Sequence, residues 1–474
     1  MRILNFIDNE FREAIGGGWI DDVEPATGEV FAQIADSDAR DVDEAAAAAK
    51  RAFPSWSRTP AAERSRLILA LADRIERDLD ELARLESRDN GKTVSLAKRL
   101  DIPRAVANFR FFATAILHES TEAHSTDLAA LNYTLRKPIG VAGLISPWNL
   151  PLYLLTWKIA PAIASGNTCV AKPSELTPAT AMKLCELAVE AGIPPGVINV
   201  VHGYGPSAGQ AIVEHKDIPL ISFTGGTITG QCVASTAAPM FKKLSLELGG
   251  KNPNLIFADA DLEQAVTTSI QSSFANQGEI CLCGSRIFVE RRIHDEFVTR
   301  FVEATKRLRV GDPTQDSTDV GALVSEAHMN KVLGYVELAQ QEGGSIATGG
   351  KRVGDRGFFV EPTVITGLGC ECRVLQEEIF GPVVTITPFD GDDQAIEFAN
   401  STRYGLSASV WTSNLTRAHR VAAALDAGTV WINCWLLRDL RVPFGGMKDS
   451  GVGREGGFES LRFFTETKNV CVKL

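Results

Sequence analysis

The chain has 474 residues, of which 45% are apolar and 23% are charged. These ordinary globular values exclude a disordered or fibrous protein, and the length predicts about three structural units. The net charge of −11 gives no general attraction to phosphate or anionic lipid, so we expect neither a nucleic acid nor a membrane as partner. The nine cysteines are too sparse for a disulfide scaffold, and Asp8 and Glu10 interrupt the apolar core that a signal peptide needs. We therefore predict a cytoplasmic protein with reduced thiols.

The first part of the chain predicts three helices. Residues 38–53 carry apolar side chains at helical spacing. A longer helix follows, with Thr59 as its cap, Pro60 in its first turn and residues 90–91 at its end. A third helix is expected over residues 103–117. We interpret these helices as structural.

From residue 139 the pattern changes to short apolar runs that alternate with helical segments. Residues 139–157 carry no charge, but Pro147, Asn149 and Pro151 would leave polar groups unsatisfied in lipid, so we interpret this stretch as a buried strand and turn. The expected strands are 141–146, 168–171, 197–201, 220–223 and 244–246. A helix with Thr177 as its cap, Pro178 in its first turn and Ala191-Gly192 at its end completes a pattern typical of βαβ units with a parallel sheet. Such sheets bind ligands at the carboxyl ends of their strands.

A second α/β block is predicted from about residue 254 to residue 449. Its helical patterns cover residues 262–273, 293–308 and 327–342. Two α/β lobes imply a cleft, and the boundary between them near Gly249-Gly250 is soft. Residues 463–474 alternate enough to form a strand.

A cysteine in a polar, glycine-bearing turn is the first candidate for chemistry. Cys281 lies between a helical segment and an apolar strand, with Cys283 two residues later. A nucleophilic cysteine needs donors or positive potential nearby to hold its thiolate, whereas the alternative is an inert core cysteine. Cys370 and Cys372 repeat the Cys-x-Cys spacing, which makes a metal site built from two such pairs conceivable. We predict no metal, because structural zinc uses wider spacings and no set of histidines accompanies the pairs.

A glutamate among leucines is the second candidate. Glu247 ends an apolar strand and precedes Leu248, Gly249 and Gly250. Burial would raise the pKa of this carboxyl toward neutrality, as a general base acting on water requires. The alternative is a surface glutamate paired with Lys251 or Lys242.

Two glycine-rich loops are alternative candidates for a nucleotide-binding site. Residues 203–209 follow a strand and resemble a dinucleotide fingerprint with one extra residue. Residues 223–230 also end a strand and open a helix whose N-terminus could face a phosphate. Each signal alone is weak.

Taken together, these residues resemble the aldehyde dehydrogenase superfamily over essentially the whole chain. The family's segments appear in order and are Pro147-Trp148-Asn149, Lys172-Pro173-Ser174-Glu175, Phe223-Thr224-Gly225, Glu247-Leu248-Gly249-Gly250-Lys251, the Cys281 loop, Glu377-Glu378-Ile379-Phe380-Gly381-Pro382 and Pro443-Phe444-Gly445-Gly446. The resemblance implies an α/β fold with a Rossmann-like cofactor domain (1–119 and 139–249), an α/β catalytic domain (250–449) and a small β oligomerisation element (120–138 and 463–474). It also implies a homodimer or homotetramer.

The resemblance implies a mechanism residue by residue. Cys281 would attack an aldehyde carbon to give a thiohemiacetal, and the Asn149 amide with the Cys281 backbone N–H would hold the oxyanion. Hydride would pass to NAD, and Glu247 would activate water to hydrolyse the thioester to a carboxylic acid. Cys283 would be a neighbour of the nucleophile.

For the cofactor, the resemblance selects the second glycine loop. Lys172 and Glu175 would bind the adenosine ribose, Glu378 would bind the nicotinamide ribose, and Gly225 and Gly230 would lie near the pyrophosphate. The remaining expected NAD contacts are Ser146, Pro147, Trp148, Gly205, Phe223, Thr224, Gly226, Leu248, Gly249 and Phe380. Apart from Gly205, residues 203–209 would form a structural turn. Gly226 departs from the family's usual serine, so a hydroxyl contact to phosphate would be missing.

Three arginines bear on the substrate. Arg438 and Arg441 lie in the family's substrate-mouth loop, and Arg104 lies on a helix that lines the entrance in the family. Both segments are similar to the 2-aminomuconate and 2-hydroxymuconate semialdehyde dehydrogenase branch, whose substrates carry a distal carboxylate that an arginine fork could bind. The alternative is local ion pairing, of Arg104 with Asp101 and of Arg438 with Asp439. A dehydrogenase of simple aliphatic or betaine-type aldehydes and a non-catalytic protein on this scaffold are the rival functions.

Overall fold

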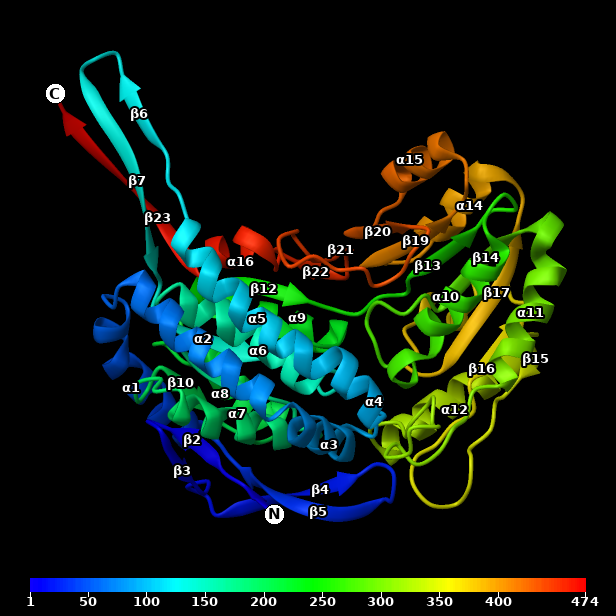
Figure 1. Ribbon diagram of the computed structural model, residues 1–474, viewed down its shortest axis with the longest axis horizontal. Helices are drawn as coiled ribbons and strands as arrows, with labels where there is room; N and C mark the ends of the chain where they lie inside the picture. The colour runs from blue at the N-terminus through cyan, green and yellow to red at the C-terminus, as the bar shows by residue number, and fades with distance from the viewer.

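The computed structural model describes residues 1–474, and its first lobe is built on an eight-stranded sheet with the order β22-β12-β11-β8-β9-β10-β2-β3 (Figure 1). Its five central strands are parallel and comprise β12 (Lys243–Glu247), β11 (Leu220–Thr224), β8 (Val141–Ile145), β9 (Thr168–Lys172) and β10 (Ile198–Val200). The edge strands β22 (Gly451–Val452), β2 (Asn5–Ile7) and β3 (Glu10–Arg12) pair antiparallel. The five predicted strands and their parallel arrangement are confirmed.

Helices surround this sheet because each buries an apolar face. The helices next to the sheet are α1 (Ala39–Trp56), α6 (Pro151–Ala164), α7 (Ala179–Glu190), α8 (Gln210–Glu214) and α9 (Thr227–Ala237). An outer layer of α2 (Ala61–Arg77), α3 (Leu79–Asn90) and α5 (Ile102–Ala115) packs on α6 and α7. A short α4 (Val94–Leu96) and a π-helical turn (Ala97–Asp101) join α3 to α5. The uncharged stretch from residue 139 is a buried strand, a turn and the start of α6, and no helix in the molecule has the length and apolarity needed to span a membrane.

The predicted single helix up to Asn90 is wrong, because the chain breaks between α2 and α3 at Asp78 (φ −97°, ψ 20°). Thr59 caps neither helix, since its hydroxyl donates to the Ser55 carbonyl at 3.2 Å. Gly91 ends α3 in the left-handed conformation (φ 90°), as predicted.

The predicted cap of α7 is also wrong. The Thr177 hydroxyl donates to the Trp148 carbonyl at 3.2 Å, and the first N–H of the helix, at Ala179, donates instead to the Asp89 carboxylate at 2.8 Å. A side chain from another helix therefore satisfies this helix end, which local sequence spacing does not reveal.

The second lobe is built on a seven-stranded sheet with the order β15-β16-β17-β14-β13-β19-β20. Its strands are β15 (Ser345–Thr348), β16 (Thr363–Thr366), β17 (Val383–Phe389), β14 (Arg286–Glu290), β13 (Pro253–Ile256), β19 (Ser407–Trp411) and β20 (Thr429–Ile432). Its helices are α10 (Leu262–Phe274), α11 (His294–Lys306), α12 (Glu326–Gln341), α13 (Arg373–Gln376), α14 (Gly391–Asn400) and α15 (Leu415–Ala424). The three helices predicted in this block are confirmed within a few residues.

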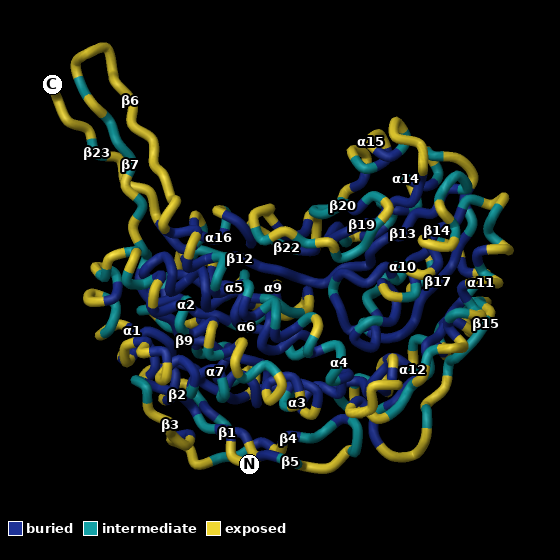
Figure 2. The backbone as a smooth tube through the Cα atoms, viewed as in Figure 1, coloured by how far each residue is buried: buried dark blue, intermediate teal, exposed yellow.

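Three smaller sheets complete the molecule. β1 (Arg2–Ile3), β5 (Glu29–Asp36) and β4 (Gly18–Glu24) pair near the N-terminus, and β18 (Tyr404–Gly405) pairs with β21 (Met447–Lys448). β23 (Thr465–Lys473), β7 (Ala130–Pro138) and β6 (Ala123–Thr126) form a sheet that projects from the first lobe next to α16 (Gly457–Phe463) and is exposed along most of its length (Figure 2). The predicted C-terminal strand is confirmed over residues 465–473.

Candidate active site

Cys281 lies on a turn between α10 and β14 that has an unusual backbone. Asn276 (φ 51°) and Gln277 (φ 56°) both adopt the left-handed conformation, which costs energy for residues other than glycine. The Asn276 amide compensates by donating to the carbonyls of Asn149 at 3.0 Å and Glu279 at 3.1 Å. The turn is thereby tied to the loop that carries Asn149.

The Cys281 thiol is the reactive candidate of the Cys-x-Cys pair. Cys281 lines both cavities described below, whereas Cys283 is only 6% exposed and lines neither. Burial, with nearby Glu378 and Glu247, raises the pKa of the Cys281 thiol to about 12, and Arg438 opposes this rise. The thiol is therefore protonated in the free chain, and its activation requires a proton acceptor.

Asn149 is held at the end of the turn that follows β8. Its side-chain amide donates to the Glu279 carbonyl at 2.9 Å, and its own backbone carbonyl accepts from Lys92 Nζ at 3.0 Å. Lys92 is fully buried and pairs with the equally buried Asp101 at 2.8 Å. An amide nitrogen carries two N–H groups, so one remains for a ligand in the cavity that Asn149 shares with Cys281.

Glu247 ends β12 in the wall of the same site. It is 4% exposed, and neither carboxylate oxygen has a hydrogen-bond partner. Burial raises its pKa well above the usual value, Glu455 adds to the rise, and Lys158 and Arg438 oppose it. The alternative of a surface glutamate paired with Lys251 or Lys242 is therefore wrong.

A buried polar trio lies beside Glu247. Lys158 on α6 donates to Glu455 and to the Ser222 hydroxyl, each at 2.9 Å, and the Ser222 hydroxyl donates to Glu455 at 3.0 Å. Sequence reasoning missed this trio. The sequence held one sign of it, because Lys158 is the one charged residue of α6 and a charge in a buried helix needs a partner.

A cavity of about 430 Å³ lies at the carboxyl ends of the parallel strands, where such sheets bind ligands. The hydroxyls of Ser146 and Thr224 line it without hydrogen-bond partners inside the chain, so they are available to a polar ligand. Other predicted cofactor residues in its wall are Pro147, Trp148, Lys172, Glu175, Gly205, Phe223, Gly225, Gly226, Leu248, Gly249, Glu378 and Phe380.

Lys172, Glu175 and Glu378 are charged side chains in the wall of this cavity. Lys172 Nζ lies 3.3 Å from Glu175, and the Glu378 carboxylate accepts from the Gly250 backbone N–H at 2.9 Å. A side chain at Gly249 would clash, because its Cβ would lie 2.1 Å from Glu378 Oε2. The glycine therefore allows the Glu378 carboxylate to reach the cavity wall.

The second glycine loop faces the cavity in part. Gly226 lies at the N-terminus of α9 with open space around it, and no side chain caps that helix. An uncapped helix N-terminus suits a phosphate. Gly230, which we predict to lie near the pyrophosphate, is buried in α9 one turn after Gly226 and is not part of the cavity wall. It also allows close packing, because an added Cβ would lie 2.4 Å from Leu248.

His328 and Lys331 on α12 also line the cavity, and sequence reasoning missed both. His328 Nε2 lies 2.6 Å from the Phe380 carbonyl, and its ring packs edge-on against Trp148 at 5.1 Å. Burial lowers the pKa of His328 to about 4, so the ring is neutral at pH 7. No local motif marks these residues, because they reach the site from the second lobe.

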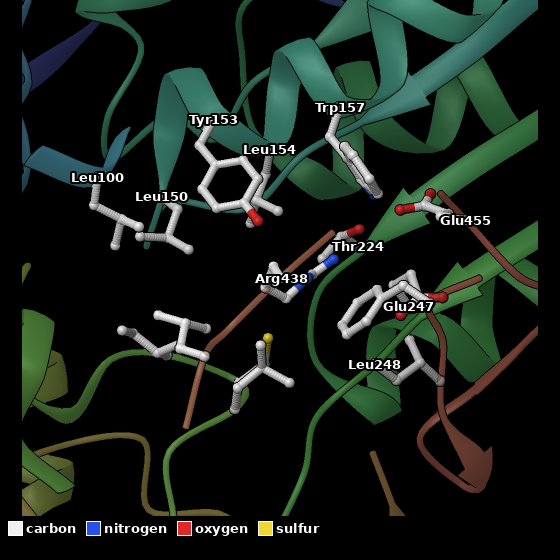
Figure 3. A pocket seen from close by; sticks show the side chains of 15 residues that line it. Leu100, Leu150, Tyr153, Leu154, Trp157, Thr224, Glu247, Leu248, Arg438 and Glu455 are labelled. Carbon is white, nitrogen blue, oxygen red and sulfur yellow. The ribbon is translucent and has the colours of Figure 1, made fainter. Parts of the chain in front are cut away.

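A second, narrower and mainly apolar cavity also has Cys281 in its wall, and Figure 3 shows the side chains that line it. Its wall includes Leu100, Leu150, Tyr153, Leu154, Trp157, Thr224, Glu247, Leu248, Leu436, Phe444 and Glu455. Arg438 is the cation in this wall, and its guanidinium stacks on Phe444 at 3.9 Å and lies 5.8 Å from the Trp157 ring centroid. It forms no ion pair, so the predicted alternative of a pair with Asp439 is wrong.

The other two predicted substrate arginines do not line this cavity. Arg441 is exposed and pairs with Asp439 at 2.6 Å. Arg104 lies over the Tyr153 ring at 5.5 Å rather than pairing with Asp101, which is taken by Lys92. Of the three, only Arg438 reaches the thiol's cavity.

Comparison with known proteins gives a consistent result. Residues 11–470 match the aldehyde dehydrogenase family. The chain is 56% identical to a 2-aminomuconic semialdehyde dehydrogenase of Danio rerio, covering 96% of this chain and 95% of that protein. It is 47% identical to a 2-hydroxymuconic semialdehyde dehydrogenase of Pseudomonas sp. (strain CF600), covering 100% and 99%. A structure of the NAD+ complex of an aldehyde dehydrogenase from Bacillus cereus is 43% identical and superimposes with a TM-score of 0.99, covering 100% and 97% of the two chains. The chain belongs to the aldehyde dehydrogenase family.

Proposed function

We propose that this chain oxidises a semialdehyde of the 2-aminomuconate or 2-hydroxymuconate type to the dicarboxylic acid, with NAD as the oxidant. The observation that carries the proposal is Arg438, an unpaired cation in a mainly apolar cavity that ends at the Cys281 thiol. A substrate with an aldehyde at one end and a carboxylate at the other satisfies both groups. The relatives named as muconic semialdehyde dehydrogenases support this substrate class.

Cys281 is the nucleophile of the proposed reaction. The thiol first loses its proton to water in the cavity. The thiolate sulfur then attacks the aldehyde carbon, and the resulting oxyanion accepts hydrogen bonds from the free N–H of the Asn149 amide and from the Cys281 backbone N–H. Each such donor contributes about 3 kcal/mol at the barrier. When bound, NAD supplies a hydride acceptor.

Glu247 is the general base for the thioester that remains on Cys281. A carboxylate with a raised pKa is a stronger base than an exposed one, so it can accept a proton from water at neutral pH. The hydroxide equivalent attacks the thioester carbon, the carbon–sulfur bond breaks, and the carboxylic acid leaves.

The residues of the larger cavity fit NAD. Lys172 and Glu175 bind the adenosine ribose, Glu378 binds the nicotinamide ribose, and the Gly225 backbone with the α9 N-terminus receives the pyrophosphate. The hydroxyls of Ser146 and Thr224 gain partners that the chain itself does not provide.

We extend the proposal to the organisation of the protein. Residues 1–119 and 139–249 form the cofactor domain, and residues 250–449 form the catalytic domain. Residues 120–138 and 463–474 form an oligomerisation element of a homodimer or homotetramer, which is supported by the projecting sheet and its exposed Leu131 and Val472. All nine cysteines are free thiols, which supports a reducing compartment such as the cytoplasm.

A substrate panel tests the proposed function. Wild type should oxidise a muconate-type semialdehyde far better than a neutral aldehyde of similar length, measured as initial NADH rates. Arg438→Ala should lower kcat/KM for the acidic aldehyde by about ten- to a hundredfold, because a charge-assisted hydrogen bond contributes roughly 1.5–3 kcal/mol. Arg441→Ala is the matched control and should change little, since its partner is Asp439. Equal losses for acidic and neutral aldehydes in Arg438→Ala would contradict the proposal.

A further inference from the structure

Tyr153 is a polar residue of the smaller cavity to which the mechanism above gives no role. It lies on α6, four residues after Asn149 and four before Trp157, so all three are carried by one short segment. Its side chain is buried, with the residue 6% exposed, and it lines the cavity together with Cys281 and Arg438. A tyrosine in this wall supplies a hydrogen-bond donor that a leucine or phenylalanine would not.

The Tyr153 hydroxyl makes no hydrogen bond within the chain, whereas its backbone carbonyl accepts from the Asn108 amide at 3.1 Å. In Figure 3 the hydroxyl points into the cavity, toward the side on which the Arg438 guanidinium lies. The hydroxyl oxygen is not among the enclosed polar atoms that lack a partner, so it is open to the cavity that Tyr153 lines and is available to a ligand there.

The other polar groups of the cavity indicate which kind of group could accept a hydrogen bond from the Tyr153 hydroxyl. Glu455 is already paired with Lys158, and Glu247 is required as the base. The Arg438 guanidinium is fixed by its stacking on Phe444, which leaves its N–H groups without an acceptor in the chain. One anionic group with several lone pairs can accept from both Arg438 and Tyr153.

Arg104 fits the same arrangement from behind the ring. Its guanidinium lies over the Tyr153 ring at 5.5 Å and is not part of the cavity wall. A cation over the ring face orients the tyrosine. Arg104 is thus a positioning residue that acts through Tyr153.

We propose that Tyr153 is a specificity-determining residue whose hydroxyl donates a hydrogen bond to the distal carboxylate of the substrate, while Arg438 pairs with the same carboxylate. The inference rests on the proposed function, because it assumes a substrate with that carboxylate. It adds a recognition group in the cavity and reassigns Arg104 from contact to support.

Tyr153→Phe tests this inference, since it removes one oxygen and keeps the ring. For a muconate-type semialdehyde, kcat/KM should fall about tenfold or more, as expected for a hydrogen bond to a charged group. The loss should appear mainly in KM, because the contact is remote from the reacting carbon and is the same in the ground and transition states. For a neutral aldehyde of similar length, kcat/KM should stay within about twofold. An unchanged ratio between the two substrates in Tyr153→Phe overturns the inference.

Parallel assays of Arg438→Ala separate the two proposals. If Arg438→Ala lowers the acid-to-neutral ratio and Tyr153→Phe does not, the proposed function stands and the role of Tyr153 is refuted. If neither variant changes the ratio, the proposed substrate class fails as well. Arg104→Met should reduce the ratio in wild type but not in the Tyr153→Phe background, because its effect requires the hydroxyl. A loss of the same size in both backgrounds contradicts the positioning role.

A binding measurement gives a readout that does not depend on turnover. The product dicarboxylate should bind Tyr153→Phe about tenfold more weakly than wild type in a calorimetric titration of the full-length protein. A monocarboxylate of similar length that lacks the distal acid should bind both equally. Equal affinities of the dicarboxylate for wild type and Tyr153→Phe would overturn the inference.

Discussion

Replacement of Lys92 by methionine tests how the Asn149 loop is held. Lys92 and Asp101 are both fully buried and lie 2.8 Å apart, and Lys92 also donates to the Asn149 carbonyl at 3.0 Å. Lys92→Met leaves the Asp101 carboxyl buried without its cation, and breaking such a pair costs about 3–5 kcal/mol. The Asn149 carbonyl loses its hydrogen bond from Lys92 but keeps the one from Asn276. The loss of the Lys92 bond therefore lowers the free energy of unfolding by about 1 kcal/mol more.

The matched control is Lys98→Met. Lys98 pairs with Asp80 at 2.8 Å, but these side chains are 37% and 66% exposed, so the pair contributes roughly 0–1 kcal/mol. Urea unfolding should therefore show a large loss for Lys92→Met and almost none for Lys98→Met. Burial raises the pKa of Asp101, so protonation relieves part of the loss, which should be smaller at pH 5 than at pH 8. Adding Asp101→Leu to Lys92→Met should recover stability, because no unpaired charge remains.

Lys92→Met should also slow the chemical step, because the Asn149 loop loses the bond from Lys92 that helps to hold it. Single-turnover NADH formation should slow in Lys92→Met by more than tenfold, as part of an oxyanion donor's roughly 3 kcal/mol is lost. Lys98→Met should match wild type. A Lys92→Met protein with wild-type stability and wild-type single-turnover rate would refute the reasoning.

Three further predictions concern the thiol, the cofactor and pH. Cys281→Ala should abolish dehydrogenase activity while Cys283→Ala keeps most of it, and comparable losses in steady-state assays would contradict the assignment of the nucleophile. NAD should be preferred over NADP, because the Glu175 carboxylate repels a 2′-phosphate. Glu175→Gln should lower the ratio of kcat/KM with NAD to kcat/KM with NADP. An unchanged ratio would show that Glu175 does not set the cofactor preference. Burial raises the pKa of Asp22 to about 7, so the folded chain keeps a proton that the unfolded chain loses above about pH 4. The free energy of unfolding should therefore fall as pH rises from about 4 to 7, and Asp22→Asn should flatten that slope in urea titrations.

Local sequence was sufficient for features that depend on neighbouring residues. The parallel strands follow from periodicity and the turn at Cys281 follows from its polar, glycine-bearing run, and the structure contains both. Local sequence left open whether Glu247 is buried or a surface partner of a lysine, and only the structure shows that it is buried. The family resemblance extended these to most of the residues around the larger cavity but not to His328 and Lys331. Sequence did not reveal that Gly230 also packs closely against Leu248, because a glycine in a motif can serve a ligand, close packing or both.

Features that depend on distant partners could not be predicted. The cap of α7 comes from Asp89, and the partner of Asp101 is Lys92 rather than Arg104. Spacing suggested that Asp439 pairs with Arg438, but Asp439 pairs with Arg441 and leaves Arg438 free to stack on an aromatic ring. Competition among several nearby charges is decided by side-chain packing, which one sequence does not encode locally.

The most direct test of the central claim is mass spectrometry of Glu247→Gln after rapid mixing with NAD and a muconate-type semialdehyde. Because the amide cannot accept a proton from water, the thioester should accumulate after one NADH per active site has formed. Peptide mapping should place an acyl group of the substrate's mass on the peptide that contains Cys281, and Cys281→Ala in the same background should remove it. Steady NADH turnover near the wild-type rate without an acylated Cys281 peptide would contradict the account.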